Sequence, residues 1–173
     1  MTIIARKAGR GRVKLQKSVN VNPRNGLTLR MLIKANIQVR LPLAHVGTLN
    51  ILSTSQGVAR SKSGKHDCIK FKIKDSVRTT PRDPIKRHDV LVRFKDTQQK
   101  TKGLALSGKN VNVVVSCSCE FFMYMCEYAL THFSASFIKY SNGQPPLQTN
   151  PSLIPFTCKH LHLALMQIAK KGW

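Results

Sequence analysis

The sequence predicts an α+β fold: a small antiparallel sheet followed by two C-terminal helices and preceded by a long basic extended arm. Two observations carry this prediction. Apolar and polar residues alternate in three short runs between residues 61 and 117, as they do in half-buried strands. After residue 119 the apolar spacing changes to that of helices. We therefore divide the 173 residues into a basic arm, 1–60, and an α+β domain, 61–173.

The arm is defined by its charge. Residues 1–66 contain 13 Lys or Arg and no acidic residue, whereas residues 117–173 contain four basic and two acidic residues. So uneven a charge attracts polyanions or acidic protein surfaces. Six basic residues near the start are the expected polyanion- or partner-binding group: Arg6, Lys7, Arg10, Arg12, Lys14 and Lys17.

Within the arm we expect mostly extended segments. Residues 13–17 and 37–41 alternate as short strands would, and Asn22–Gly26 has the composition of a turn. Residues 27–35 fit either a helix or a strand. A polar loop is expected at residues 53–65.

Three strands are expected in the domain, around residues 68–74, 88–95 and 111–117. The first carries Lys70, Lys72 and Lys74 on its polar side, which indicates a solvated face or a binding surface. The third ends directly at Cys117.

Two helices follow. Residues 120–133 are rich in apolar and aromatic side chains, and Ser118 is a candidate N-cap. Residues 159–169 form the last predicted helix, with Thr157 as its candidate N-cap and Lys170 and Lys171 at its end.

The most specific pattern is a pair of short ligand motifs at these junctions. Cys117 and Cys119 stand at the end of a predicted strand, and Cys158 and His160 stand at the start of a predicted helix, with 38 residues between the pairs. Three thiolates and one imidazole form a common tetrahedral zinc shell, closed to a catalytic water. We therefore predict that a structural Zn²⁺ clamps both helices to the end of the sheet.

Two nearby residues are rival ligands. Cys126 follows on the first helix, although buried free cysteines are more often part of the core. His162 lies two residues after His160 and would point away from it on a helix. The ligand set is left open at these two positions.

The Cys-x-Cys and Cys-x-His pairs resemble the SWIM zinc motif, which occurs in DNA- and protein-binding proteins. The segment Val113–Leu165, with Tyr140–Pro146, Thr149–Pro151 and Cys158–His160, resembles a zinc-motif segment in structural proteins of tailed bacteriophages. This similarity covers about a third of the chain. It implies a virion component of the tail, baseplate or neck.

An enzyme is not expected. The seven carboxylates are scattered singly, and no set of nucleophile, base and oxyanion donors can be assembled from the sequence. We expect no small-molecule substrate, and no membrane-spanning run or secretory signal is recognised.

The sequence thus favours a non-enzymatic virion structural protein that binds other virion proteins through its basic arm and is assembled in the host cytoplasm. A nucleic-acid-binding zinc protein, in DNA packaging or a ribonucleoprotein, is the alternative, and a ribosomal-type protein is a weaker third. The distribution of aromatic residues argues against base stacking by the basic part of the chain. Only two of them, Phe71 and Phe94, precede residue 117.

Overall fold

The structure, a computed structural model, describes residues 26–40, 46–61, 64–75, 86–95 and 111–172. The elements are, in order, α1 (Leu29–Val39), the short 3₁₀ helix η3 (Val46–Thr48), β1 (Leu49–Ser61), β2 (Gly64–Asp75), β3 (Arg87–Phe94), β4 (Val113–Cys117), the π-helical turn η4 (Phe122–Cys126), α2 (Glu127–His132) and α3 (Lys159–Lys171). The α+β prediction is confirmed: strands β1 to β4 form one antiparallel sheet in sequential order.

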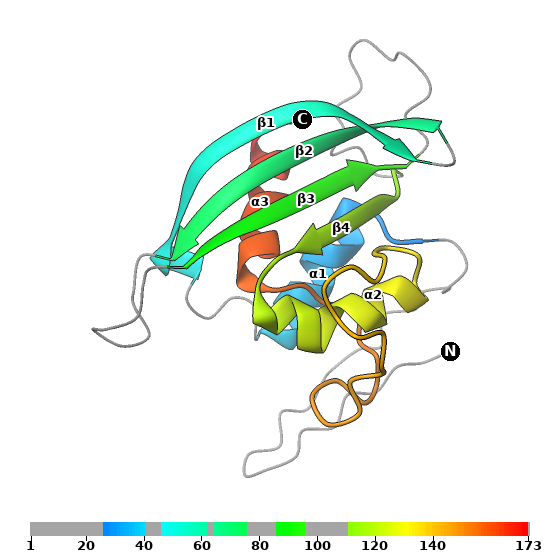
Figure 1. Ribbon diagram of the computed structural model, residues 1–173. Coiled ribbons are helices and arrows are strands. Elements are labelled where there is room, and N and C mark those ends of the chain that lie inside the picture. The colour runs from blue at the N-terminus through cyan, green and yellow to red at the C-terminus, as the bar shows by residue number, and fades with distance from the viewer. Residues whose placement is uncertain (1–25, 41–45, 62–63, 76–85, 96–110, 173) are drawn as a thin grey trace.

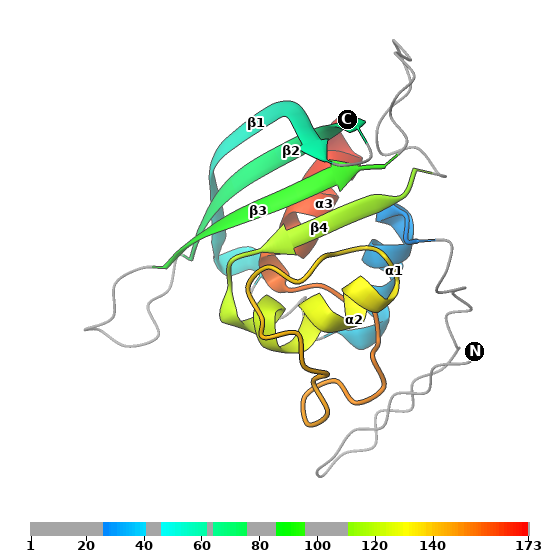
Figure 2. The same ribbon diagram turned by 45° about the vertical axis from the view of Figure 1, so that its right-hand side comes forward.

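The sheet curves over two helices. α3 and α1 lie against one face, and α2 lies beyond the edge formed by β4 (Figures 1 and 2). No helix of the described residues covers the opposite face, which we call the outer face. The prediction placed both C-terminal helices at the end of the sheet: α2 does lie there, whereas α3 lies against the inner face.

The core lies between the inner face and α1 and α3. Alternate residues of three strands point inward and are buried: Ile69, Phe71 and Ile73; Val90, Val92 and Phe94; Val113, Val115 and Cys117. α3 contributes a matching buried stripe: Leu161, Ala164, Leu165 and Ile168. Each large apolar side chain buried in this way contributes about 1.5–3 kcal/mol, so this layer is the main source of stability from packing.

Residues 27–39 join the domain rather than an extended arm. Thr28 caps α1 through its hydroxyl, which accepts a hydrogen bond from the backbone N–H of Met31 at 3.3 Å. Leu29, Leu32 and Ala35 share one buried side, which is the spacing of a helix. The strand predicted at residues 37–41 is wrong for residues 37–39, because they continue this helix to its left-handed cap at Arg40.

The polar loop predicted at residues 53–65 is wrong for residues 53–61. These residues belong to the edge strand β1. Its pairing with β2 runs from Leu49↔Asp75 to Ser61↔Gly64, with a register shift between Ile51 and Ser53. The side chains of residues 52–58 are exposed, so the backbone ladder to β2 defines this strand while its side chains carry no amphipathic pattern. The boundary predicted at residue 60 is therefore too late, because α1 and β1 belong to the domain. Residues 1–25, including 13–17, lie outside the described residues.

Candidate metal centre

The first ligand pair is held where β4 ends. Cys117 is the last residue of β4, opposite Val90 of β3, and its side chain is buried on the inner face. Ser118 is bonded twice to Asp89: its N–H donates to the carbonyl of Asp89 at 3.1 Å, and its hydroxyl accepts from the N–H of Asp89 at 3.0 Å. These bonds fix the turn that carries the chain from Cys117 to Cys119.

Two of the predicted ligands also cap helices through sulfur. The N–H of Phe122 donates to Cys119 Sγ at 3.4 Å, and the N–H of Leu161 donates to Cys158 Sγ at 3.5 Å. In both cases the sulfur takes the position that a Ser or Asp side chain occupies at an ordinary N-cap. Each thiolate would thus lie where the partial positive charge of a helix start favours it.

The N-caps predicted at Ser118 and Thr157 are therefore wrong. The hydroxyl of Ser118 is taken up by β3, as described above. Thr157 instead pairs with Asn36 of α1: its hydroxyl accepts from Asn36 Nδ2 at 2.7 Å, and its N–H donates to Asn36 Oδ1 at 2.7 Å. Ser118 and Thr157 each directly precede the residue that caps the helix, Cys119 or Cys158. Their hydroxyl groups are bonded to β3 and α1 instead.

The structure brings all four predicted ligands together. The Sγ atoms of Cys117, Cys119 and Cys158 and one ring nitrogen of His160 lie within 4.8 Å of one another, and all four residues are buried. The Nδ1 atom of His160 faces the sulfurs, 3.9 Å from Cys117 Sγ. This cluster, which we call the Cys₃His cluster, could hold a metal ion.

The electrostatics of the cluster favour one thiolate beside two thiols. Hydrogen bonds from Cys117 and Cys158 lower the pKa of Cys119 far below its ordinary value of 9.0. Burial raises the pKa values of Cys117 and Cys158 well above 9.0. A bound cation would reverse this preference and favour the thiolate form at all three sites.

A carboxylate orients the histidine from its far side. Asp75, the last residue of β2, accepts from His160 Nε2 at 3.2 Å, and its other oxygen lies 3.4 Å from His88 Nε2. Lys159 Nζ lies 2.8 Å from the same carboxylate. Such a contact leaves Nδ1 free for a metal and is common around metal-bound histidines.

The pKa values of these groups follow from their surroundings. Burial alone would raise the pKa of Asp75, but hydrogen bonds from Lys159 and His160 outweigh it, and the pKa falls below 3.8. Burial, followed by the nearby His160 ring at a centroid distance of 4.2 Å, lowers the pKa of His88 below 6.5. Asp75 is therefore an anion and His88 a neutral ring at neutral pH.

Asp75 is a candidate functional residue that the sequence analysis missed. It lies 85 residues before His160 in the chain, and only the end of β2 brings the two together. A second set of side chains also lies close enough together to hold a cation: Asp75, His88 and His160. We interpret it as support for His160, because His160 already belongs to the Cys₃His cluster.

Neither rival residue belongs to the four-member cluster. Cys126 is buried in the π-helical turn, where its Sγ lies 3.9 Å from the carbonyl oxygen of Phe121, and burial raises its pKa well above 9.0. The Nδ1 atom of His162 lies 3.0 Å from Asn36 Nδ2, and burial lowers the pKa of His162 below 6.5. The four predicted ligands, Cys117, Cys119, Cys158 and His160, are thus the set that the geometry assembles.

The proposed basic binding group, Arg6 to Lys17, lies outside the described residues. Within the described part of the chain, no helix has both the length and the apolar character that a membrane crossing requires.

No protein-family model matches the chain, and no curated protein or solved structure is significantly similar to it.

Proposed function

We propose that the Cys₃His cluster binds one structural Zn²⁺. Zinc prefers tetrahedral sites of thiolates and imidazoles, and Zn–S bonds of about 2.3 Å with Zn–N bonds of about 2.0 Å put a sulfur and a nitrogen ligand roughly 3.5 Å apart. The 3.9 Å between Cys117 Sγ and His160 Nδ1 lies within about 0.4 Å of this spacing. Hard cations such as Ca²⁺ and Mg²⁺ prefer oxygen ligands, which the cluster lacks.

The role of this zinc would be to hold the fold, and no catalysis is proposed. Four protein ligands fill a tetrahedral shell and leave no position for a water or substrate. The ligands come from the end of β4, the turn before η4 and the first turn of α3, so one ion joins three segments. Metal binding of this kind contributes folding free energy directly.

We further propose that the protein is a virion structural component of a tailed phage, at the tail, baseplate or neck. The observation that carries this proposal is the buried Cys₃His cluster, because it assembles from the segment that resembles phage structural proteins. The net charge of +22 supports binding to acidic neighbouring subunits.

Particle incorporation tests this role. Replacing Arg10, Arg12, Lys14 and Lys17 by Gln should block incorporation into particles while zinc content stays at one ion per chain. The charges are expected to act together, since single exposed ion pairs contribute only about 0–1 kcal/mol. The control variant removes four charges that lie on the helices instead: Arg30, Lys34, Lys170 and Lys171. Normal incorporation of the arm variant would contradict the proposal.

A nucleic-acid-binding zinc protein is the second candidate. It is favoured by exposed lysines on the outer face of the sheet, Lys70 and Lys72, neither of which has a carboxylate of the described residues within 4.0 Å. A protein that binds phosphates loses affinity steeply as salt rises, so the salt dependence of binding to free nucleic acid separates this candidate from protein binding.

A further inference from the structure

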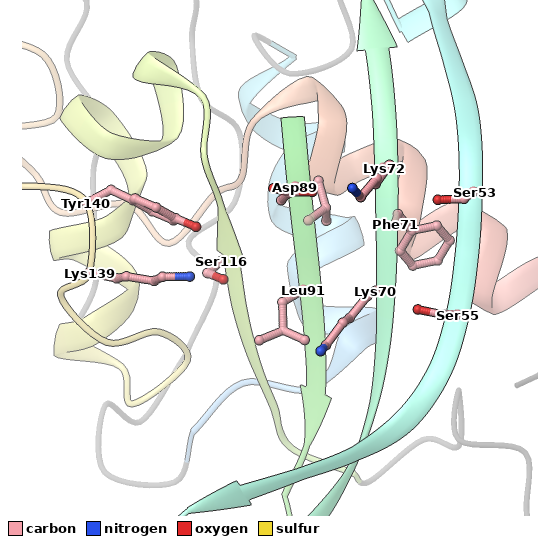
Figure 3. A pocket seen from close by; sticks show the side chains of 11 residues that line it. Ser53, Ser55, Lys70, Phe71, Lys72, Asp89, Leu91, Ser116, Lys139 and Tyr140 are labelled. Atoms are coloured by element: carbon pink, nitrogen blue, oxygen red, sulfur yellow. The ribbon is translucent and has the colours of Figure 1, made fainter. Parts of the chain in front are cut away.

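A groove crosses the outer face of the sheet. It has a volume of about 320 Å³ and runs from β1 across β2 and β3 to the segment after α2 (Figure 3). Its main side chains are Lys70, Lys72, Asp89, Leu91, Lys139 and Tyr140. A volume near 300 Å³ is at the small end of ligand pockets, so the groove has room for one nucleotide-sized group at a time.

The far wall of the groove is held rigidly. Glu127 of α2 is fully buried, and its carboxylate accepts hydrogen bonds from three successive backbone N–H groups: Lys139 at 3.2 Å, Tyr140 at 3.1 Å and Ser141 at 2.7 Å. The same segment is tied to β4, where the N–H of Val115 donates to the carbonyl of Ala135 at 2.9 Å. The backbone positions of Lys139 and Tyr140 are therefore set before any ligand arrives.

The groove is positively charged and its cations are available. Lys70, Lys72 and Lys139 contribute three ammonium groups, against the single carboxylate of Asp89. Among the described residues, none of the three ammonium groups has a carboxylate within 4.0 Å. Uncompensated charges converging on one groove favour an anionic ligand.

The ring of Tyr140 lies beside one of these charges. Tyr140 reaches over the groove toward Ser116, and Lys139 Nζ lies 4.6 Å from the centre of its ring (Figure 3). Outside the residues that line the groove, the guanidinium of Arg93 lies 5.9 Å from the ring centre of Phe137, which is 38% exposed. The chain keeps charges and rings in separate halves, but the fold places them on one surface.

We propose that this groove binds single-stranded nucleic acid, with Lys70, Lys72 and Lys139 on the phosphates and Tyr140 against a base. Single strands are bound by positively charged grooves that also offer aromatic rings for stacking. The inference deepens the second of the two proposed functions and assigns it a site. It does not depend on the arm or on incorporation into particles.

The test uses the zinc-loaded 173-residue chain and the fluorescence anisotropy of labelled oligothymidylate and oligouridylate over a range of salt concentrations. The groove variant carries Lys70→Gln and Lys72→Gln, and its control carries Lys34→Gln and Lys170→Gln on exposed helix positions. Each lost phosphate contact lowers the slope of log affinity against log salt by about 0.7 for single strands. The groove variant should therefore lose about 1.4 from the slope and the control none. Equal changes in both variants would overturn the inference.

Variants of Tyr140 supply the second part of the test. Tyr140→Leu should weaken oligonucleotide binding about tenfold, the size expected for one lost stacking contact, while Tyr140→Phe should retain it. Wild-type affinity for Tyr140→Leu would overturn the proposal. Displacement of the oligonucleotide by polyglutamate at equal charge would do the same and would assign the groove to acidic protein segments. If only the four-site arm variant loses affinity, nucleic-acid binding holds but the groove is not its site.

Discussion

The inner and outer faces of the sheet are built from the same strands and have opposite character. On β4, Cys117 points inward and belongs to the Cys₃His cluster, while the preceding Ser116 lines the outer groove. On β2, Phe71 is 1% exposed, while Lys70 and Lys72 on either side of it are exposed. Because side chains alternate along a strand, one segment of chain can stabilise the fold and present a binding surface.

The two faces should also respond differently to change. Inner residues are packed and their polar groups have partners, so substitutions there act on folding and metal binding. Outer charges are solvated and screened by salt, so substitutions there act on binding and leave stability almost unchanged. The following experiments test this contrast, from the largest expected effect to the smallest.

Loss of a metal ligand should have the largest effect. Cys158→Ser is expected to abolish zinc binding and cooperative unfolding, because structural zinc contributes about 10–16 kcal/mol in zinc-finger peptides and domains are stable by only about 5–15 kcal/mol. Zinc content and thermal unfolding followed by circular dichroism measure this. Cys126→Ala, which removes a buried sulfur outside the cluster, should keep one zinc per chain. A Cys158→Ser protein that retains its zinc would refute the assigned ligand set.

Zinc affinity should fall steeply as the pH falls. Burial raises the pKa values of Cys117 and Cys158 above 9.0, so both thiols carry protons at neutral pH in the metal-free protein and must release them to bind zinc. Each released proton adds one to the slope of log affinity against pH, so the affinity should rise at least about 100-fold per pH unit below these pKa values. Competition with a chelator of known affinity measures the slope, and a slope near zero would exclude thiolate ligation.

Glu127→Gln should loosen the wall of the groove while leaving the cluster loaded. The change removes the charge that three backbone N–H groups share, at a cost of about 2–3 kcal/mol in the free energy of unfolding. Denaturant unfolding reports the cost. Glu120→Gln is the matched control, because its carboxylate is exposed and pairs only with Lys86 at 3.2 Å among the described residues. Equal stability of the two variants would show that the buried carboxylate is unimportant.

Asp75→Asn should weaken zinc binding without unfolding the domain. The carboxylate orients His160 through Nε2, and loss of such a partner usually costs 10- to 100-fold in metal affinity, here about 10-fold or more. Asp89→Asn on the outer face is the control and should leave zinc affinity unchanged. If both variants bind zinc as tightly as wild type, Asp75 has no role in positioning the histidine.

Local patterns were sufficient to predict several parts of the molecule. The alternation at residues 68–74 and 88–95 predicted β2 and β3, because one buried face imposes a period of two. The spacing of Cys117, Cys119, Cys158 and His160 predicted the cluster, because two short ligand pairs can close one tetrahedral site. Both are short-range signals that a sequence carries in full.

Other parts had no local signal. β1 is an edge strand with exposed side chains, so its sequence resembles a loop and only its ladder to β2 defines it. The caps at Cys119 and Cys158 depended on which donors and acceptors the neighbouring strands and α1 had already taken. Which side chain caps a helix therefore depends on tertiary contacts. The sequence analysis placed each cap one residue before the observed one, at Ser118 and Thr157.

The sequence by itself determined the fold class, the ligand types and the separation of basic from aromatic residues along the chain. The tertiary structure alone placed Asp75 behind His160 and set Tyr140 and Lys139 across one groove from Lys70 and Lys72. The physical reason is range: periodicity and motif spacing arise within a few residues, whereas these contacts join segments about 70–85 residues apart and exist only after the sheet has formed.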